Sequence, residues 1–173
     1  MRTTDASWTE PVIRNATAGD LPAINDIYNW YVASCTCTWQ MEPETMESRR
    51  AWFAAHGSGL PVLVAESGGD IVGWGALSQF HPRQGYRHTL EDSVYVRHDA
   101  QGRGLGKRLL AALLERAPAT GCHTIVAVIS GDQPASIALH RKFGFVDAGR
   151  IREAGNKFGP WLDVVYMQRM VTP

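Results

Sequence analysis

Hydrophobic and polar positions alternate along the chain with two periods, one helical and one typical of strands. Near the N-terminus, apolar residues recur three and four positions apart, which places them on one face of a helix. They are Leu21, Ile24, Ile27, Tyr28 and Tyr31. Asp20 and Pro22 are typical of a helix start, so a helix is predicted from Asp20 to about Ser34, after a short strand over 12–17.

The following segments predict a second helix and then a change to strand periodicity. The second helix extends from about Pro43 to Gly57. After it, PVLVAE and IVGWGALSQF flank the sequence SGGD, whose paired glycines permit positive φ. Residues 61–80 are therefore predicted to form an antiparallel hairpin. The sequence LEDSVYV, residues 90–96, predicts the next strand.

A glycine-rich loop, HDAQGRGLGKRLL (98–110), joins this strand to an amphipathic helix predicted over 104–117. Its alternate glycines stand beside Arg103, Lys107 and Arg108. The N-terminus of a helix offers unpaired N–H groups and the positive end of the helix dipole, and glycines let an anion come close. The loop is therefore predicted to hold a phosphate. Its spacing fits neither the P-loop nor the dinucleotide-binding fingerprint, and a plain helix start is the alternative.

The last third of the chain predicts a strand, a helix and a further strand. HTIVAVIS (123–130) is a continuous apolar run typical of a buried strand, PASIALHRKFG (134–144) is helical, and FGFVDAGRI (143–151) returns to strand. The elements alternate without a repeat or a low-complexity linker. This order predicts a mixed α/β fold in a single domain over 1–173, with a flexible N-terminal extension over about 1–10.

Composition limits the partners. The 173 residues are 45% hydrophobic, and Lys plus Arg equals Asp plus Glu at 17 each, so no overall charge attracts nucleic acid or a membrane surface. No signal peptide and no spanning helix are predicted, and we expect a cytoplasmic protein. The three cysteines, Cys35, Cys37 and Cys122, are odd in number, which does not favour a disulfide framework, and their spacing does not fit a metal site. Free thiols and no metal are therefore predicted.

The strand SVYV, the loop QGRGLG and the segment QPASIALHRKFGFV, in this order, resemble the GCN5-related N-acetyltransferase (GNAT) superfamily. Gln101, Gly104 and Gly106 match its [QR]-x-x-G-x-[GA] loop signature. The resemblance implies an α/β (α+β) GNAT fold, with a mixed, mostly antiparallel central sheet of about seven strands, about four flanking helices and splayed central strands. It also implies acetyl-coenzyme A (acetyl-CoA) as the cofactor, its pyrophosphate held by the loop amides.

The resemblance implies further contacts to acetyl-CoA. Backbone groups of the central strand would hold the acetyl and pantetheine parts, and Gln133 stands where many members have an asparagine on the pantetheine arm. The implied cofactor-binding residues are Val94, Tyr95, Val96, Gln101, Gly102, Arg103, Gly104, Leu105, Gly106, Lys107, Gln133 and Ser136.

Longer segments, among them YRHTLEDSVYV and GRIREAGNKFGPWLDVVYMQ, resemble the phosphinothricin and methionine sulfoximine acetyltransferase branch. This branch acetylates the α-amine of small amino acids or analogues of the phosphinothricin, methionine sulfoximine or methionine sulfone type. Its members commonly form homodimers, and a homodimer is expected here. The alternatives are an acetyltransferase of protein or peptide N-termini and a non-catalytic acetyl-CoA-binding module.

Transfer to an amine requires a base, because a protonated amine has no lone pair. Strand alternation places Glu91 and Ser93 on one face and Asp92 and Val94 on the other, so only one of the two carboxylates can face the cleft. Glu91 is the predicted base, since the family carries a glutamate at this point. Pairing of Glu91 with an arginine is the alternative.

His140 is the predicted general acid for the departing thiolate. Most of the superfamily has a tyrosine at the matching position, whereas the phosphinothricin branch has a histidine, and imidazole can donate a proton near neutral pH. A surface or packing role is the alternative.

The predicted substrate-binding residues are His81, Pro82, Arg83, Arg87, Glu91, Asp92 and Ser93. Arg83 and Arg87 are predicted to bind the carboxylate of an amino-acid substrate. Relatives often have Arg-Pro-Phe where this chain has His81-Pro82-Arg83. The arginine therefore stands at a different position or has a different role. Aromatic residues are predicted to wall a small pocket or to belong to the core: Trp39, Phe80, Tyr86, Phe158 and Trp161.

Overall fold

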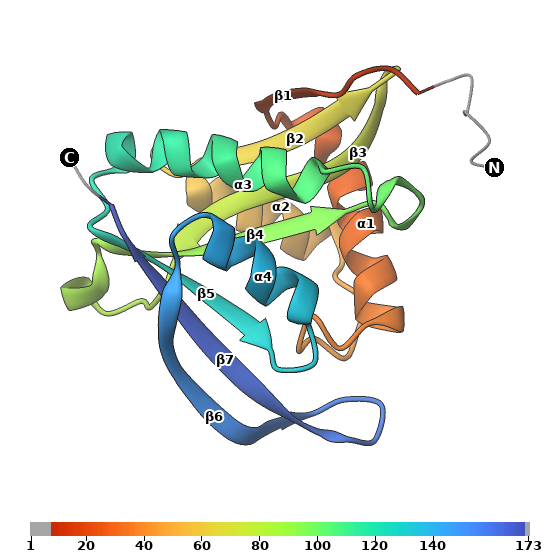
Figure 1. Ribbon diagram of the computed structural model, residues 1–173. Helices are drawn as coiled ribbons and strands as arrows, with labels where there is room; N and C mark the ends of the chain where they lie inside the picture. Colours follow the sequence, from red (N-terminus) through yellow and green to blue (C-terminus); the bar gives the residue numbers. More distant parts are fainter. Residues whose placement is uncertain (1–7, 172–173) are drawn as a thin grey trace.

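A seven-stranded sheet forms the centre of the computed structural model, which describes residues 8–171 (Figure 1). The strands are β1 (Val12–Asn15), β2 (Val62–Ser67), β3 (Asp70–Gln79), β4 (Thr89–Val96), β5 (Thr124–Ser130), β6 (Val146–Asn156) and β7 (Trp161–Met170). The α-helices are α1 (Leu21–Ser34), α2 (Met46–His56), α3 (Leu105–Arg116) and α4 (Pro134–Lys142). Short 3-10 turns cover Ala18–Asp20, Gln84–Tyr86, His98–Ala100 and Ala117–Thr120.

The strand order is β1-β2-β3-β4-β5-β7-β6. Every neighbouring pair is antiparallel except β4 and β5, which are parallel. Their pairing begins at Thr89 with Thr124 and stops at Glu91 with Val126, although both strands continue. The predicted mixed, mostly antiparallel sheet with splayed central strands is confirmed.

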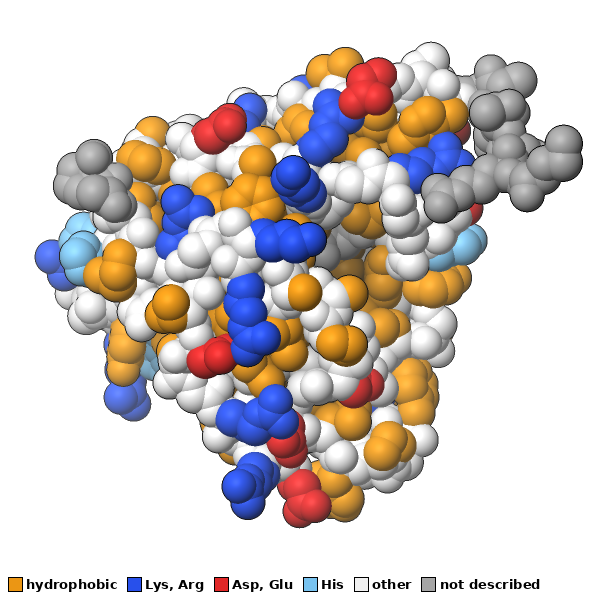
Figure 2. All heavy atoms as spheres, viewed as in Figure 1, with side chains coloured by type: hydrophobic (Ala, Val, Ile, Leu, Met, Phe, Trp, Pro, Cys, Tyr) orange, Lys and Arg blue, Asp and Glu red, His pale blue; other side chains and the backbone are white. Residues whose placement is uncertain are grey.

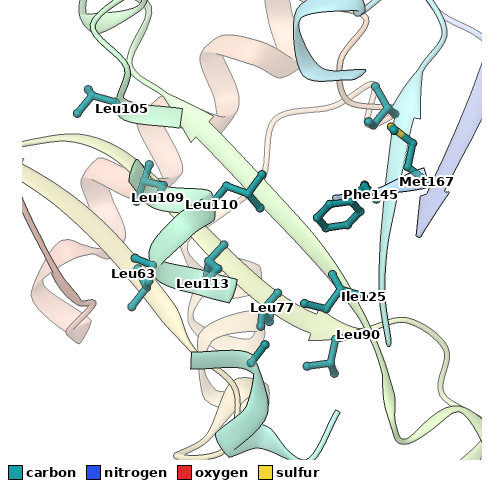
Figure 3. Close-up of a cluster of buried hydrophobic side chains, with 14 of the residues drawn as sticks. Leu63, Leu77, Leu90, Leu105, Leu109, Leu110, Leu113, Ile125, Phe145 and Met167 are labelled. Atoms are coloured by element: carbon teal, nitrogen blue, oxygen red, sulfur yellow. The ribbon is translucent and has the colours of Figure 1, made fainter. Parts of the chain in front are cut away.

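Helices cover both faces of the sheet, α3 and α4 on one side and α1 and α2 on the other (Figure 1). Leucines of α3 pack with apolar side chains of β2 to β5 into the larger core (Figure 3). On the opposite face, the predicted apolar stripe of α1 packs against Val64 and Trp74 of the sheet. Each fully buried leucine contributes about 1.5–3 kcal/mol, so the two cores hold the sheet rigid on either side of β4.

α1 begins directly after Asp20 as predicted, but the start of α2 and the capping of α1 differ from the prediction. α2 begins at Met46 rather than near Pro43, because Thr45 Oγ1 accepts a hydrogen bond from the Ser48 N–H at 3.1 Å. At α1, the Asp20 carboxylate does not cap the helix but accepts from the N–H of Thr17 at 2.7 Å.

β6 extends five residues past its predicted end at 151, to Asn156, because it pairs with β7 in a long hairpin. The turn of the β2–β3 hairpin has the predicted geometry, with φ of 60° at Gly68 and 89° at Gly69.

The first described residues belong to the extension predicted to be flexible over 1–10. The ring of Trp8 lies 4.0 Å from the guanidinium carbon of Arg103. The Thr9 N–H donates a hydrogen bond to Ser67 Oγ at 3.2 Å. This end of the extension therefore contacts the sheet and the glycine loop, and the part before Trp8 lies outside the described residues.

Candidate active site

A cleft opens where β4 and β5 separate. It is a cavity of about 830 Å³, and its wall includes residues of α1, α2, α4, β3, β4, β5 and the segment 37–40. Beyond Glu91, the β4 backbone groups directed toward β5 have no strand partner. The cavity therefore passes between the splayed strands and is reached from both faces of the sheet.

Glu91 lies at the last paired position of β4 and lines the cavity. Tyr95 contacts Tyr28 of α1, so strand alternation places Glu91 on the same side. Burial raises the pKa of Glu91 to about 7, and repulsion from Asp92 adds to the shift. Within residues 8–171, Glu91 forms no ion pair, so the alternative of an arginine partner is not what the structure shows.

Asp92 points to the other face of β4, where it meets His140 of α4. His140 Nε2 lies 2.9 Å from Asp92 Oδ2, and the exposed fractions of the two side chains are only 6% and 2%. His140 Nδ1 donates to the Ser136 carbonyl oxygen at 2.7 Å. Burial lowers the pKa of His140, but the hydrogen bond and charge of Asp92 outweigh it, so the pKa is raised above its usual value. Both ring nitrogens are thus engaged.

The glycine loop leads into α3, which begins at Leu105 with Gly104 at its N-cap position. Gly102 and Gly104 have φ of 75° and 78°, and among the described residues only their chain neighbours come within 4 Å of where a Cβ would stand. The first amides of α3 have no intrahelical acceptor because they lie in its first turn. The loop therefore presents an open backbone surface that fits a phosphate, and Gly106 joins it to the cavity wall.

The predicted cofactor-binding residues divide between the cavity and the helix start. Those on the cavity wall are Val94, Tyr95, Val96, Gln101, Gly106, Gln133 and Ser136. Those outside its wall are Gly102, Arg103, Gly104, Leu105 and Lys107. The side chain of Leu105 is buried in the core, so only its backbone can face a ligand.

Both predicted glutamine contacts are engaged within the protein. Gln101 Nε2 donates to the Tyr31 hydroxyl at 2.7 Å, and that hydroxyl donates to the Val96 carbonyl oxygen at 2.5 Å. Gln133 Nε2 donates to Thr36 Oγ1 at 3.2 Å. These bonds tie α1 and the segment after it to both rims of the cleft.

The structure does not bring the β3–β4 loop to the cavity. His81 and Pro82 lie outside its wall, and Arg83 and Arg87 are exposed. The loop packs on itself instead, with the rings of His81 and Tyr86 4.9 Å apart. Of the predicted substrate-binding residues, Glu91, Asp92 and Ser93 line the cavity.

Among the predicted aromatic walls, only Trp39 lines this cavity. Phe158 and Trp161 are exposed, and Phe80 contacts Tyr86 in the β3–β4 loop. Trp39 is held by the β6–β7 hairpin, since a Cβ on Gly155 would lie 2.2 Å from its ring. Glycine is required at 155 for this close approach.

Sequence reasoning missed the wall built by α2 and β3. Arg49 of α2 and Trp74 of β3 both line the cavity and are almost fully buried. A signal was present, because Arg49 stands at helical spacing between Met46 and Trp52, in the middle of an apolar stripe. A charged residue at such a position is buried when the stripe packs.

No group of three or more His, Cys, Asp or Glu side chains within residues 8–171 is placed to hold a metal ion. No helix in the same range is long and apolar enough to cross a membrane.

The chain is similar to known acetyltransferases in sequence and in structure. The acetyltransferase (GNAT) family profile matches residues 24–145. An L-methionine sulfoximine/L-methionine sulfone acetyltransferase of Pseudomonas paraeruginosa is 45% identical over 163 residues, which cover 93% of this chain and 95% of that protein. A phosphinothricin N-acetyltransferase of Alcaligenes faecalis is 40% identical over 160 residues, covering 91% and 81%.

A solved structure of yncA from Salmonella typhimurium with its cofactor acetyl-CoA superposes with a TM-score of 0.92. It is 37% identical in sequence, and the match covers 95% of both chains. The family profile, the named relatives and the solved structure each match most of the chain, and its cleft lies between splayed central strands beside a glycine loop. The chain therefore belongs to the GNAT family of acetyltransferases.

Proposed function

We propose that this N-acetyltransferase transfers the acetyl group of acetyl-CoA to the α-amine of a small amino acid or analogue of the phosphinothricin, methionine sulfoximine or methionine sulfone type. One observation carries the proposal: an unpaired, largely buried Glu91 carboxyl lies in the cleft between the splayed strands. The names of the two sequence relatives support this acceptor class. The cytoplasmic location expected from the sequence stays a prediction.

Glu91 is suited to accept the proton of the attacking amine. A base works best when its pKa lies near the working pH, and burial has moved the pKa of Glu91 from the usual carboxyl range to about 7. The ionised fraction at neutral pH is then large enough to accept a proton. The protonated form is stable enough to keep that proton until the amine has reacted.

The unpaired backbone of β4 is suited to orient the acetyl group. Acetyl-CoA, when bound, supplies an activated thioester. Free N–H groups of the segment from Asp92 to Val96 can donate to its carbonyl oxygen, where negative charge develops during transfer. Because both cores hold β4 in place, these donors need no reorganisation during the reaction.

The glycine loop and its basic neighbours are suited to the phosphates of the cofactor. Lys107, in the first turn of α3, is exposed and takes part in no ion pair among the described residues. Lys and Arg side chains also form a column across the face that carries α3 and α4 (Figure 2). Positive charge beside open amides favours a pyrophosphate.

Replacing Gly104 by valine is expected to raise the dissociation constant for acetyl-CoA roughly 10- to 100-fold, the loss of one or more hydrogen bonds to a charged group. A β-branched residue is strained at a φ of 78° and would turn the loop amides away from the ligand. Isothermal titration calorimetry measures the effect. Gly59→Val is the control, since Gly59 has open space and no positive φ. Unchanged affinity in a folded Gly104→Val protein would mean that the loop does not hold the phosphates.

The proposed function is tested by acetyl-CoA-dependent release of free thiol with a panel of acceptors. We expect release with methionine sulfone, methionine sulfoximine and phosphinothricin, and little with peptides that have free N-termini. Release with peptides and none with amino acids would instead establish the peptide N-terminal alternative. Tight acetyl-CoA binding without turnover of any acceptor would favour the non-catalytic alternative.

We also propose that the protein is a homodimer, formed through the β6–β7 hairpin. β6 is an edge strand, and Val146 and Trp161 are each 65% exposed. Apolar side chains beside a free strand edge are typical of an interface between subunits.

Light scattering at micromolar concentration is expected to give about twice the chain mass of 19.1 kDa. Trp161→Glu should shift the protein to the monomer mass. Met41→Glu, at an equally exposed apolar residue of the loop before α2, should leave the dimer intact. A monomer mass for the unmodified protein would contradict this proposal.

A further inference from the structure

Arg49 is held in a fixed position by aromatic rings and an amide. Its guanidinium carbon lies 4.8 Å from the ring centres of Tyr28 and Trp52 and 5.6 Å from that of Trp74. Arg49 Nε donates to Asn25 Oδ1 at 3.1 Å, and the Asn25 amide in turn donates to the Glu44 carbonyl oxygen at 2.9 Å. The side chain is therefore preorganised, and its exposed fraction is only 3%.

Among the described residues, no carboxylate contacts the Arg49 guanidinium, although the charge of Glu44 acts on it from farther away. Glu44, an acidic residue on the same cavity wall, instead accepts from Gln40 Nε2 at 3.0 Å. A buried guanidinium without a directly bound anion is unfavourable, so an anion from outside the chain would stabilise it.

Two buried donors on this wall have no acceptor among residues 8–171. They are an Nη atom of Arg49 and the indole Nε1 of Trp74. Both residues line the cavity that holds Glu91. Register places Trp74 on the same face of the sheet as Glu91, because Trp74 pairs with Tyr95, four residues after Glu91 on β4. The unsatisfied donors thus line the cavity on the side of the sheet where Glu91 lies.

We propose that Arg49, assisted by Trp74, binds oxygen atoms of the acceptor amino acid. The chemistry required is that of an oxyanion or a strongly polar oxo group, which could be the α-carboxylate or the side-chain sulfone or phosphinate. Arg49 supplies the charge and a planar donor fork, and Trp74 supplies a second donor. This inference rests on the proposed function and identifies the specificity-determining residue of that site. Arg49 thereby takes the role of substrate-binding arginine that the sequence analysis predicted for Arg83 and Arg87, which are exposed.

The test combines variants with acceptors that lack one group at a time. The acceptors are methionine sulfone, its α-amide, which lacks the carboxylate, and norleucine, which lacks the sulfone oxygens. Wild-type kcat/KM should fall roughly 10- to 100-fold for the acceptor that lacks the group bound by Arg49. In Arg49→Met this difference should shrink to a few fold, because the partner of that group is gone. The acceptor whose penalty disappears identifies the α-carboxylate or the side-chain oxygens as the bound group.

Trp74→Phe keeps an aromatic ring at this position and removes the Nε1 donor together with part of the indole volume, so it tests the same site if Arg49→Met does not fold. It should weaken methionine sulfone binding, measured by calorimetry with coenzyme A present, and reduce the same acceptor difference by several fold. Arg83→Met and Arg87→Met are the matched arginine controls and should leave the acceptor differences unchanged.

Equal losses on all three acceptors in both Arg49→Met and Trp74→Phe would overturn the inference, as would a loss of discrimination in the Arg83 or Arg87 variant. Failure of the wild-type protein to acetylate any amino acid would instead count against the proposed function. The two failures are therefore distinguishable.

Discussion

Replacing Glu91 by glutamine is expected to lower kcat about 10²- to 10⁴-fold at pH 7, the usual cost of losing an acid–base group. Glutamine keeps the size and the hydrogen-bonding ability of the side chain but cannot accept a proton. A peptide α-amine has a pKa of about 8, and that of a free amino acid is higher, so raising the pH supplies neutral amine without a base. The defect should therefore shrink steadily between pH 7 and pH 10.

The pH profile of the wild-type enzyme tests the role of Glu91 as the base independently. Only ionised Glu91 accepts a proton, and burial raises its pKa to about 7, so kcat/KM should fall as the pH decreases through 7. Glu91→Gln should lack this limb. Glu115→Gln, at an exposed position of α3, is the control and should leave the profile unchanged. A Glu91→Gln enzyme as active as the wild type at pH 7 would show that the base lies elsewhere.

Breaking the Asp92–His140 pair is expected to cost about 3–5 kcal/mol of folding free energy, because Asp92→Asn leaves a buried imidazole without its charge partner. Asp147→Asn breaks an exposed ion pair between β6 and Arg141, which lies in α4 next to His140. This change should cost no more than about 1 kcal/mol. Urea or thermal denaturation of the two variants measures the difference. Equal stabilities would mean that the buried pair contributes no more than a surface ion pair.

The loss in Asp92→Asn should depend on pH. The pKa of His140 is raised in the folded protein, so its contribution is fully present below its unfolded pKa of about 6.5 and is lost as the pH rises through the folded pKa. The stability difference between wild type and Asp92→Asn should therefore be larger at pH 6 than at pH 9. A difference that does not change with pH would show that Asp92 does not shift the titration of His140.

Kinetics of His140→Ala separate a catalytic role from a packing role. If His140 donates a proton to the departing sulfur, it must first release Asp92 or Ser136, since both ring nitrogens are engaged. kcat should then fall by less than in Glu91→Gln, without rescue at high pH and with acetyl-CoA affinity nearly unchanged. A lower melting temperature with unchanged kcat would assign His140 to packing.

The sequence by itself determined the elements that depend on local periodicity. The apolar stripe of α1, the paired glycines of the β2–β3 turn and the glycine loop at the start of α3 were all predicted, because each depends on residues close together in the chain. Alternation along β4 also placed Glu91 and Asp92 on opposite faces correctly. The expectation that only one of them faces the cleft was wrong, because the cavity passes between the splayed strands and both line it. Boundaries such as the start of α2 were missed where a capping hydroxyl, and not the apolar pattern, decides the first turn.

Only the tertiary structure decided which side chains meet in the cleft. His140 lies 48 residues from Asp92, and their pairing follows from the docking of α4 over the splayed strands. Arg49 is a charged residue in an apolar stripe, and its aromatic neighbours come from three different elements. Arg83 and Arg87 satisfy the chemical requirement for an amino-acid site but stand on a loop that folds away from it. Residue type and spacing specify local conformation, whereas a site depends on contacts between distant segments, which burial and packing determine together.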